Sequence, residues 1–152
     1  MNDAFISYSN EDEHLAKFVH DHLKTQNITA FLASVSIPHG EKWSPKVWSA
    51  LNSAQWVIFL ASKAACASPH VQQELGAAIS RQKNLIPIVW DQPVSALPGW
   101  TGNYQAINLA NRTMLDLQVE IDGIAAKIKA KKASGLALLG FIVLGIALSN
   151  GG

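Results

Sequence analysis

The sequence has a single cysteine and almost no excess of either charge. Cys66 stands alone in 152 residues, which excludes a disulfide framework and a cysteine-based metal site. Twelve Lys and Arg residues against eleven Asp and Glu residues give a formal net charge of +1. A dedicated nucleic-acid-binding protein would carry a basic face, so we expect no nucleic-acid partner.

The first residues, "MNDAFISYSNEDEH", lack a basic region followed by a long apolar run, so we expect no signal peptide. Together with the lone cysteine, this pattern favours a reducing cytosol. The composition itself is globular, because hydrophobic residues make up 49% of the chain. A chain of this length forms one domain with a proper core and not two.

Short β-prone runs alternate five times with amphipathic or capped helical patterns. We expect strands at 4–9, 28–33, 55–62, 84–91 and 104–109, and helices at 11–26, 46–54, 68–82 and 113–132. This alternation predicts a flavodoxin-like, doubly wound α/β fold, in which a five-stranded parallel sheet has helices on both faces. Ligands bind such sheets outside the carboxyl ends of the strands.

Apolar spacing also predicts which side chains form the core. We expect Trp48 and Trp56 to be core residues. On the last predicted helix, one face carries the residues Met114, Leu117, Ile121, Ile124 and Ile128. Ser68 followed by Pro69 is typical of a helix start, with serine as the cap and proline at the first position.

Four motifs in order resemble the TIR (Toll/interleukin-1 receptor) domain family. The stretch "DAFISYSNED" resembles the first signature box, and "SIPHGEKW" resembles the loop after the second strand. The stretches "SPHVQQELG" and "NLIPIVWD" resemble the third helix and fourth strand of the family. The resemblance covers residues 1–131, is of bacterial type, and leaves residues 132–152 as a hydrophobic tail.

The resemblance implies an activity and a catalytic residue. Many TIR domains of this kind cleave NAD+ between nicotinamide and ribose, and in bacteria such proteins often serve in antiphage defence. Glu74 occupies the position of the family's catalytic glutamate. His70 stands where a tryptophan is frequent, and Ala33 where many members have an aspartate. The competing interpretation is that Glu74 is an ordinary charge at the edge of a helix.

NAD+ would be the substrate, and we expect no cofactor. One carboxylate can stabilise the oxocarbenium-like carbon, and the leaving nicotinamide is already cationic, so no general acid is needed. Candidate contacts comprise rings, backbone amides at a helix start and a closing loop. These candidate binding residues are Phe5, Tyr8, Ser9, Asn10, Gly40, Lys42, Trp43 and His70. We expect no metal site, because the spacing of His14, His20 and His22 does not bring three ligands together.

The tail departs from the globular pattern. Lysines at 127, 129, 131 and 132 precede an uncharged apolar stretch from about residue 133 to residue 149. This pattern predicts a single transmembrane helix in contact with lipid, with a cytoplasmic TIR domain anchored to the inner membrane. The alternative is a helical extension that packs in an oligomer. Either arrangement would favour self-association, which family members commonly need.

Two other functions are compatible with the sequence. The chain could be a TIR domain without catalysis, acting as a scaffold or as a mimic in host signalling. It could also be another flavodoxin-like enzyme, such as a nucleoside deoxyribosyltransferase, which uses a glutamate against an N-glycosidic bond. The stretch "FISYS" and the loop around Gly40 argue against the second of these.

Overall fold

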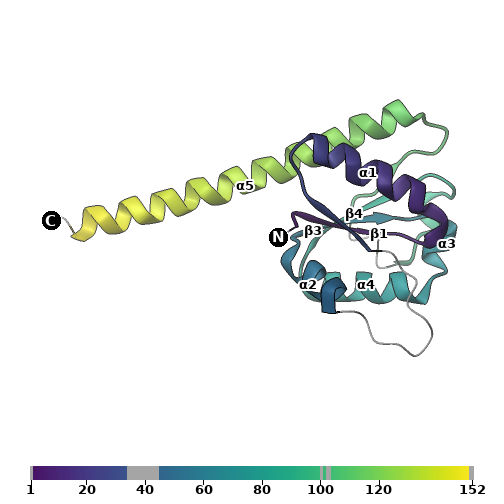
Figure 1. The fold of residues 1–152 in the computed structure, drawn as a ribbon, viewed down its shortest axis with the longest axis horizontal. Coiled ribbons are helices and arrows are strands. Elements are labelled where there is room, and N and C mark those ends of the chain that lie inside the picture. The colour runs from purple at the N-terminus through teal and green to yellow at the C-terminus, as the bar shows by residue number, and fades with distance from the viewer. Residues whose placement is uncertain (1, 34–44, 100, 102–103, 151–152) are drawn as a thin grey trace.

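The protein is a three-layer α/β domain from which its last helix extends (Figure 1). The computed structural model describes residues 2–33, 45–99, 101 and 104–150, without the side chains of Ala33, His70, Glu74 and residues 135–150. The strands are β1 (Ala4–Ser7), β2 (Ala30–Ala33), β3 (Trp56–Leu60), β4 (Asn84–Val89) and β5 (Ile107–Asn108). The α-helices are α1 (Glu13–Thr25), α2 (Pro45–Ser53), α3 (Lys63–Cys66), α4 (Pro69–Ser80) and α5 (Met114–Asn150). Two 3-10 turns, η1 (Asn10–Asp12) and η2 (Val94–Ala96), complete the described elements.

All five strands are parallel and follow the order β2-β1-β3-β4-β5. The predicted five-stranded parallel sheet is therefore confirmed, and its order is that of flavodoxin-like folds. β2 lies on one side of β1, whereas β3, β4 and β5 follow on the other side. The order in which strands are added to the sheet therefore reverses between β1 and β3. This reversal creates a topological switch point, where open α/β sheets bind ligands.

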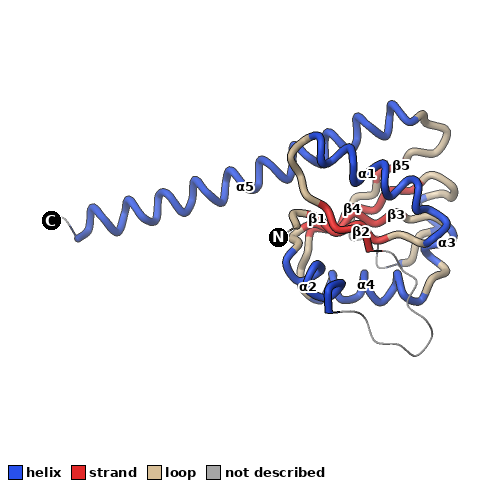
Figure 2. The backbone as a smooth tube through the Cα atoms, viewed as in Figure 1, coloured by secondary structure: helices blue, strands red, loops and turns tan. Residues whose placement is uncertain are grey.

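Alternate strand residues build two cores, one on each face of the sheet. In β3, Ile58 and Leu60 face α1 and α5, whereas Val57 and Phe59 face α2, α3 and α4. Figure 2 shows the strands between these two helical layers. Both faces are covered because a parallel sheet is stable only when neither face meets water.

Two predicted core positions are wrong. Trp48 on α2 is 37% exposed, and its ring lies 5.1 Å from the Arg81 guanidinium, so it packs beside a cation at the surface. Met114 is 51% exposed, because the first turn of α5 extends beyond the edge of the sheet core. Leu117, Ile121 and the later predicted positions on that face are buried as predicted.

The tail predictions are corrected by the structure. The backbone of α5 is continuous from Met114 to Asn150, so residues 132–150 do not form a separate helix. Within the described part of the chain, no helix combines the length and the apolar character that membrane crossing requires. The predicted transmembrane anchor and the inner-membrane localisation are therefore wrong, and the predicted lipid contact through such a helix has no support in the described residues.

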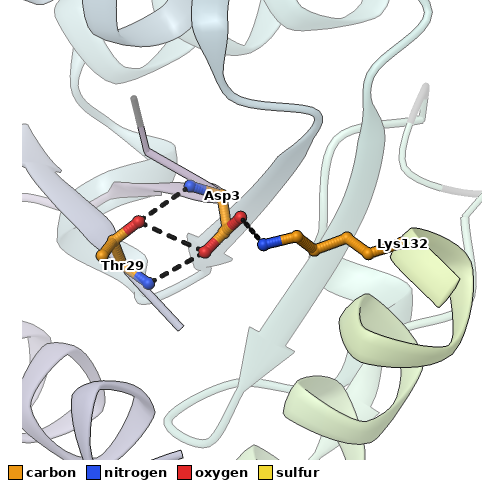
Figure 3. Close-up of polar contacts among 3 residues, drawn as sticks. All are labelled: Asp3, Thr29 and Lys132. Atoms are coloured by element: carbon orange, nitrogen blue, oxygen red, sulfur yellow. Dashed lines mark hydrogen bonds and ion pairs between the residues drawn. The ribbon is translucent and has the colours of Figure 1, made fainter. Parts of the chain in front are cut away.

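Asp3 ties the amino end of the sheet to α5 (Figure 3). Its carboxylate accepts hydrogen bonds from the backbone N–H and the hydroxyl of Thr29, at 3.0 and 3.2 Å. It also pairs with the Lys132 ammonium at 2.8 Å. Partial burial raises the pKa of Asp3, but the bonds from Lys132 and Thr29 outweigh this effect and hold that pKa below 3.8. One carboxylate thus links β1, β2 and α5.

The buried face of α5 yields the first prediction. Ile121→Ala should lower the free energy of unfolding by about 2–5 kcal/mol, because it leaves a cavity between α5 and the sheet. Lys127→Ala, an exposed change on the same helix, should stay within about 0.5 kcal/mol. Urea unfolding measures both variants, and equal losses would contradict the packing described for α5.

Asp3 yields a second prediction, on pH. Its pKa is lower in the folded state, so its stabilisation is present above pH 3.8 and is lost as the pH falls through the folded-state pKa. Asp3→Asn should therefore destabilise the protein at about pH 7, and by less at about pH 3. Urea unfolding at both pH values tests this. A difference between wild type and variant that stays constant or grows on acidification would refute the assignment.

Candidate functional site

The candidate site lies at the carboxyl edge of the sheet, where three central strands pass into helices. After β1 the chain continues through Ser9 into η1, after β3 through Ser62 into α3, and after β4 through Asp91. Helix α4 begins nearby, because only two residues separate it from α3. The Ser68 hydroxyl caps α4 by accepting the Val71 N–H at 3.4 Å, and Pro69 occupies the first helical turn, as predicted.

Asp12 joins the loops that follow β1 and β3. The Ser9 hydroxyl donates to Asp12 Oδ2 at 2.9 Å, and the Ser62 hydroxyl donates to the same oxygen. Ser62 Oγ in turn accepts the Ala65 N–H at 3.0 Å, which caps α3. Ser9 and Ser62 are 8% and 2% exposed, so these bonds lie almost out of water. The network sits at the β1/β3 switch point.

A second group of contacts fixes the loop after β4. Both carboxylate oxygens of Asp91 accept the Lys63 backbone N–H, at 3.2 and 3.1 Å. The Gln92 amide donates to the Ala61 carbonyl at 3.0 Å and contacts Cys66 Sγ at 3.4 Å. Burial raises the pKa of the Cys66 thiol, and the charge of Asp91 adds to this, although the Gln92 bond opposes it. A raised pKa disfavours the thiolate, which is the reactive form of cysteine.

The predicted ligand contacts in and just after β1 divide into two buried rings and two residues at the start of η1. Phe5 and Tyr8 are 0% and 2% exposed and lie in the cores on opposite faces of the sheet. Neither ring presents a face at the sheet edge, since the strand alternation directs both into packed layers. Asn10 is exposed at the start of η1, directly after Ser9. The structure thus places Ser9 and Asn10 at the candidate site and Phe5 and Tyr8 in the core.

The remaining predicted contacts fall in less fully described parts of the chain. Gly40, Lys42 and Trp43 lie outside the described residues. The backbone positions of His70 and Glu74 belong to α4, but their side chains are outside the description. The catalytic role of Glu74 therefore stays a prediction.

Two of the three histidines on α1 pair with carboxylates. His20 pairs with Asp21, and His22 pairs with Asp122 of α5, each at 2.8 Å. Among the described residues, no group of three or more His, Cys, Asp or Glu side chains is arranged to hold a metal ion.

Sequence reasoning missed the bridging role of Asp12, Ser62 and Asp91. In the sequence alone, Ser9 and Asp12 match only the spacing of a helix capping box. A usable signal was present, because each residue follows a buried strand by a few positions, and parallel strands bring such positions to one edge. The bond from Ser62 to Asp12 could not be seen without the sheet order, which makes β1 and β3 neighbours.

A hollow of about 420 Å³ lies at the opposite, amino edge of the sheet. It is lined by Trp56, Ile128 and polar residues that include Asp3 and Lys131. The Lys131 ammonium donates to Asn84 Oδ1 at 3.1 Å and lies 5.6 Å from the centre of the Trp56 ring. This hollow is remote from the strand ends that carry Asp12 and Asp91, so we do not assign the chemistry to it.

Comparison with solved structures supports the fold. The chain is similar to the TIR domain of the Toll-related receptor TRR-2 from Hydra magnipapillata, with 17% identity over 71% of this chain and 84% of that chain, and a TM-score of 0.59. It is also similar to a metazoan TIR-STING receptor from C. gigas in complex with 2',3'-cGAMP, with 24% identity and a TM-score of 0.65. That match covers 84% of this chain and 39% of the receptor.

A third similar structure is that of the TIR domains of the activated Roq1 resistosome, with 15% identity over 84% of this chain and 83% of that chain, and a TM-score of 0.55. No curated protein matches the chain. A family model described as "TIR domain" matches residues 4–124, which is most of the sequence. The match spans all five strands and the first turns of α5. The chain belongs to the TIR domain family.

Proposed function

We propose that this TIR domain cleaves NAD+ at the bond between nicotinamide and ribose, with Glu74 as the catalytic residue. The observation that carries the proposal is the place of Glu74 on α4, in a chain that matches the TIR family from residue 4 to residue 124. In bacteria, such an activity would deplete NAD+ or make a signal during antiphage defence.

The reaction needs little beyond one well-placed carboxylate. The bond from the nicotinamide nitrogen to the ribose C1′ breaks, and its electron pair leaves with neutral nicotinamide. The ribose carbon becomes oxocarbenium-like, and a negative carboxylate beside it stabilises that charge. Water then adds to the carbon and loses a proton, which gives ADP-ribose. Attack by a group of the same molecule would instead give a cyclic product.

The backbone around Glu74 is held firmly. Val71 and Leu75 are fully buried, and Ala78 is 1% exposed, so one face of α4 is fixed against the sheet. Glu74 lies six residues after the Ser68 cap, or roughly 9 Å along the helix from its start. Because α4 starts at the carboxyl edge, the Glu74 backbone is within two helical turns of that edge.

The dinucleotide would lie across the switch point between β1 and β3. η1 begins there, and the backbone N–H groups of Ser9 and Asn10 at its start suit a phosphate. The buried rings of Phe5 and Tyr8 are omitted from this binding site. The loop with Gly40, Lys42 and Trp43, and the position of His70, stay predicted contacts.

Self-association without catalysis is the second candidate function. Leu115 and Val119 on α5 are 71% and 68% exposed, and they are four residues apart on one helical face. Large apolar side chains grouped at a surface favour a protein partner. We propose a second copy of this chain as that partner, by analogy with the assembled TIR domains of the Roq1 resistosome.

Glu74→Gln tests the enzymatic proposal. The variant should release nicotinamide from NAD+ at least about 100-fold more slowly, because the amide cannot offset positive charge on the ribose carbon. Glu13→Gln removes an exposed carboxylate from α1 and should leave the rate unchanged. Chromatography of nicotinamide and of the second product measures the rate and identifies the product. Equal rates for wild type and Glu74→Gln would end the assignment.

The association candidate makes a separate prediction. Leu115→Glu combined with Val119→Glu should shift the full chain toward monomer in sedimentation, because each change places a charge in an apolar contact. Lys127→Glu, a charge change two helical turns further along α5, should leave the distribution as in wild type. A double variant that sediments like wild type would rule out this surface.

A further inference from the structure

Asp12 is a carboxylate that the proposed reaction has not used, although it occupies the centre of the candidate site. One of its oxygens, Oδ2, receives both the Ser9 and Ser62 hydroxyls. Within the described residues, the other oxygen, Oδ1, has no hydrogen-bond partner. Asp12 is only half-buried, so part of its side chain is open at the sheet edge.

The two serines fix the carboxylate from both sides of the switch point. Ser9 follows β1 and Ser62 follows β3. These two strands are paired in register, from Ala4 opposite Trp56 to Ser7 opposite Phe59. Ser62 is itself held, since its oxygen accepts the Ala65 N–H at the start of α3. A carboxylate whose orientation is fixed in advance loses little freedom when it binds a donor.

A carboxylate at the carboxyl edge of a parallel sheet is a suitable acceptor for a sugar hydroxyl. In dinucleotide-binding α/β folds generally, an acidic side chain at this edge receives a hydroxyl of the ribose. Ala33, at the end of β2, has no carboxyl group to play this part. Asp12 follows β1, the strand next to β2, and supplies a carboxylate at the same edge.

We propose that Asp12 binds a ribose hydroxyl of the substrate through Oδ1, with Ser9 and Ser62 as its positioning residues. This inference rests on the proposed cleavage of NAD+ and adds a specificity contact to it. It makes the β1/β3 switch point the place where the ribose is recognised. A substrate that lacked the hydroxyl would leave a fixed carboxylate unpaired at the site.

The test combines protein variants with altered ligands. Binding of NAD+ is measured by calorimetry on the full chain in the Glu74→Gln background, in which we expect cleavage to be slow. Asp12→Ala should raise the Kd for NAD+ by about tenfold or more, the loss expected for a hydrogen bond to a charged group. Asp21→Ala removes a carboxylate that is 77% exposed on α1 and should leave the Kd unchanged.

Two NAD+ analogues separate hydroxyl recognition from a structural role. Each analogue lacks the hydroxyls of one ribose. One analogue lacks the hydroxyl that binds Asp12, and for it Asp12→Ala should cause no further loss of affinity. The same variant should still weaken binding of the other analogue. If Asp12→Ala weakens both analogues as much as it weakens NAD+, Asp12 only holds the loops together and the proposal is wrong.

Asp12→Asn provides a second variant that keeps the shape of the side chain. Its amide can donate to the two serine hydroxyls, which then accept, and its oxygen still faces the ligand with less charge. It should show the same selectivity between the two analogues with a smaller loss of NAD+ affinity. The proposal can therefore be tested even if the alanine variant misfolds. Unchanged NAD+ affinity in both folded variants overturns the role of Asp12 alone. A wild-type chain that neither binds nor cleaves NAD+ overturns the proposed function as well.

Discussion

Burial of both faces of the parallel sheet is the constraint on which the rest of this structure depends. Because the strands run in one direction, every connection must cross a face of the sheet, and the crossing helices supply the cover. Alternate residues of β3 therefore enter two separate cores. The same parallel arrangement collects the loops after β1, β3 and β4 at one edge, which is where the candidate site lies.

The two edges of the sheet are built differently. At the carboxyl edge, Asp12 and Asp91 hold the loops and leave one oxygen of Asp12 without a partner in the described part of the chain. At the amino edge, both oxygens of Asp3 have partners, in Thr29 and Lys132, and these contacts connect α5 to the sheet. A carboxylate with one unpaired oxygen suits ligand recognition, whereas one with both oxygens paired suits structural support.

The sequence predicted the parallel sheet and the general location of the site, but not the contacts within it. Strands such as β3 and β4 could be predicted because a strand buried on both faces is an unbroken apolar run. Trp48 was misjudged, because ring size alone does not reveal that Arg81 offers a surface partner. The bond between Asp12 and Ser62 joins residues fifty positions apart and depends on strand order. Periodicity carries no information about such long-range pairings.

Membership of the TIR family is compatible with NAD+ cleavage and with association without catalysis. The position of bound NAD+ distinguishes these two functions. The most direct measurement is a crystal structure of the Glu74→Gln full chain soaked with NAD+. We expect the dinucleotide at the carboxyl edge, with a ribose hydroxyl within hydrogen-bond distance of Asp12 Oδ1 and the nicotinamide ribose beside residue 74. Density for NAD+ in the hollow beside Trp56 and Lys131, with the β1/β3 switch point empty, would show that the proposed site is wrong.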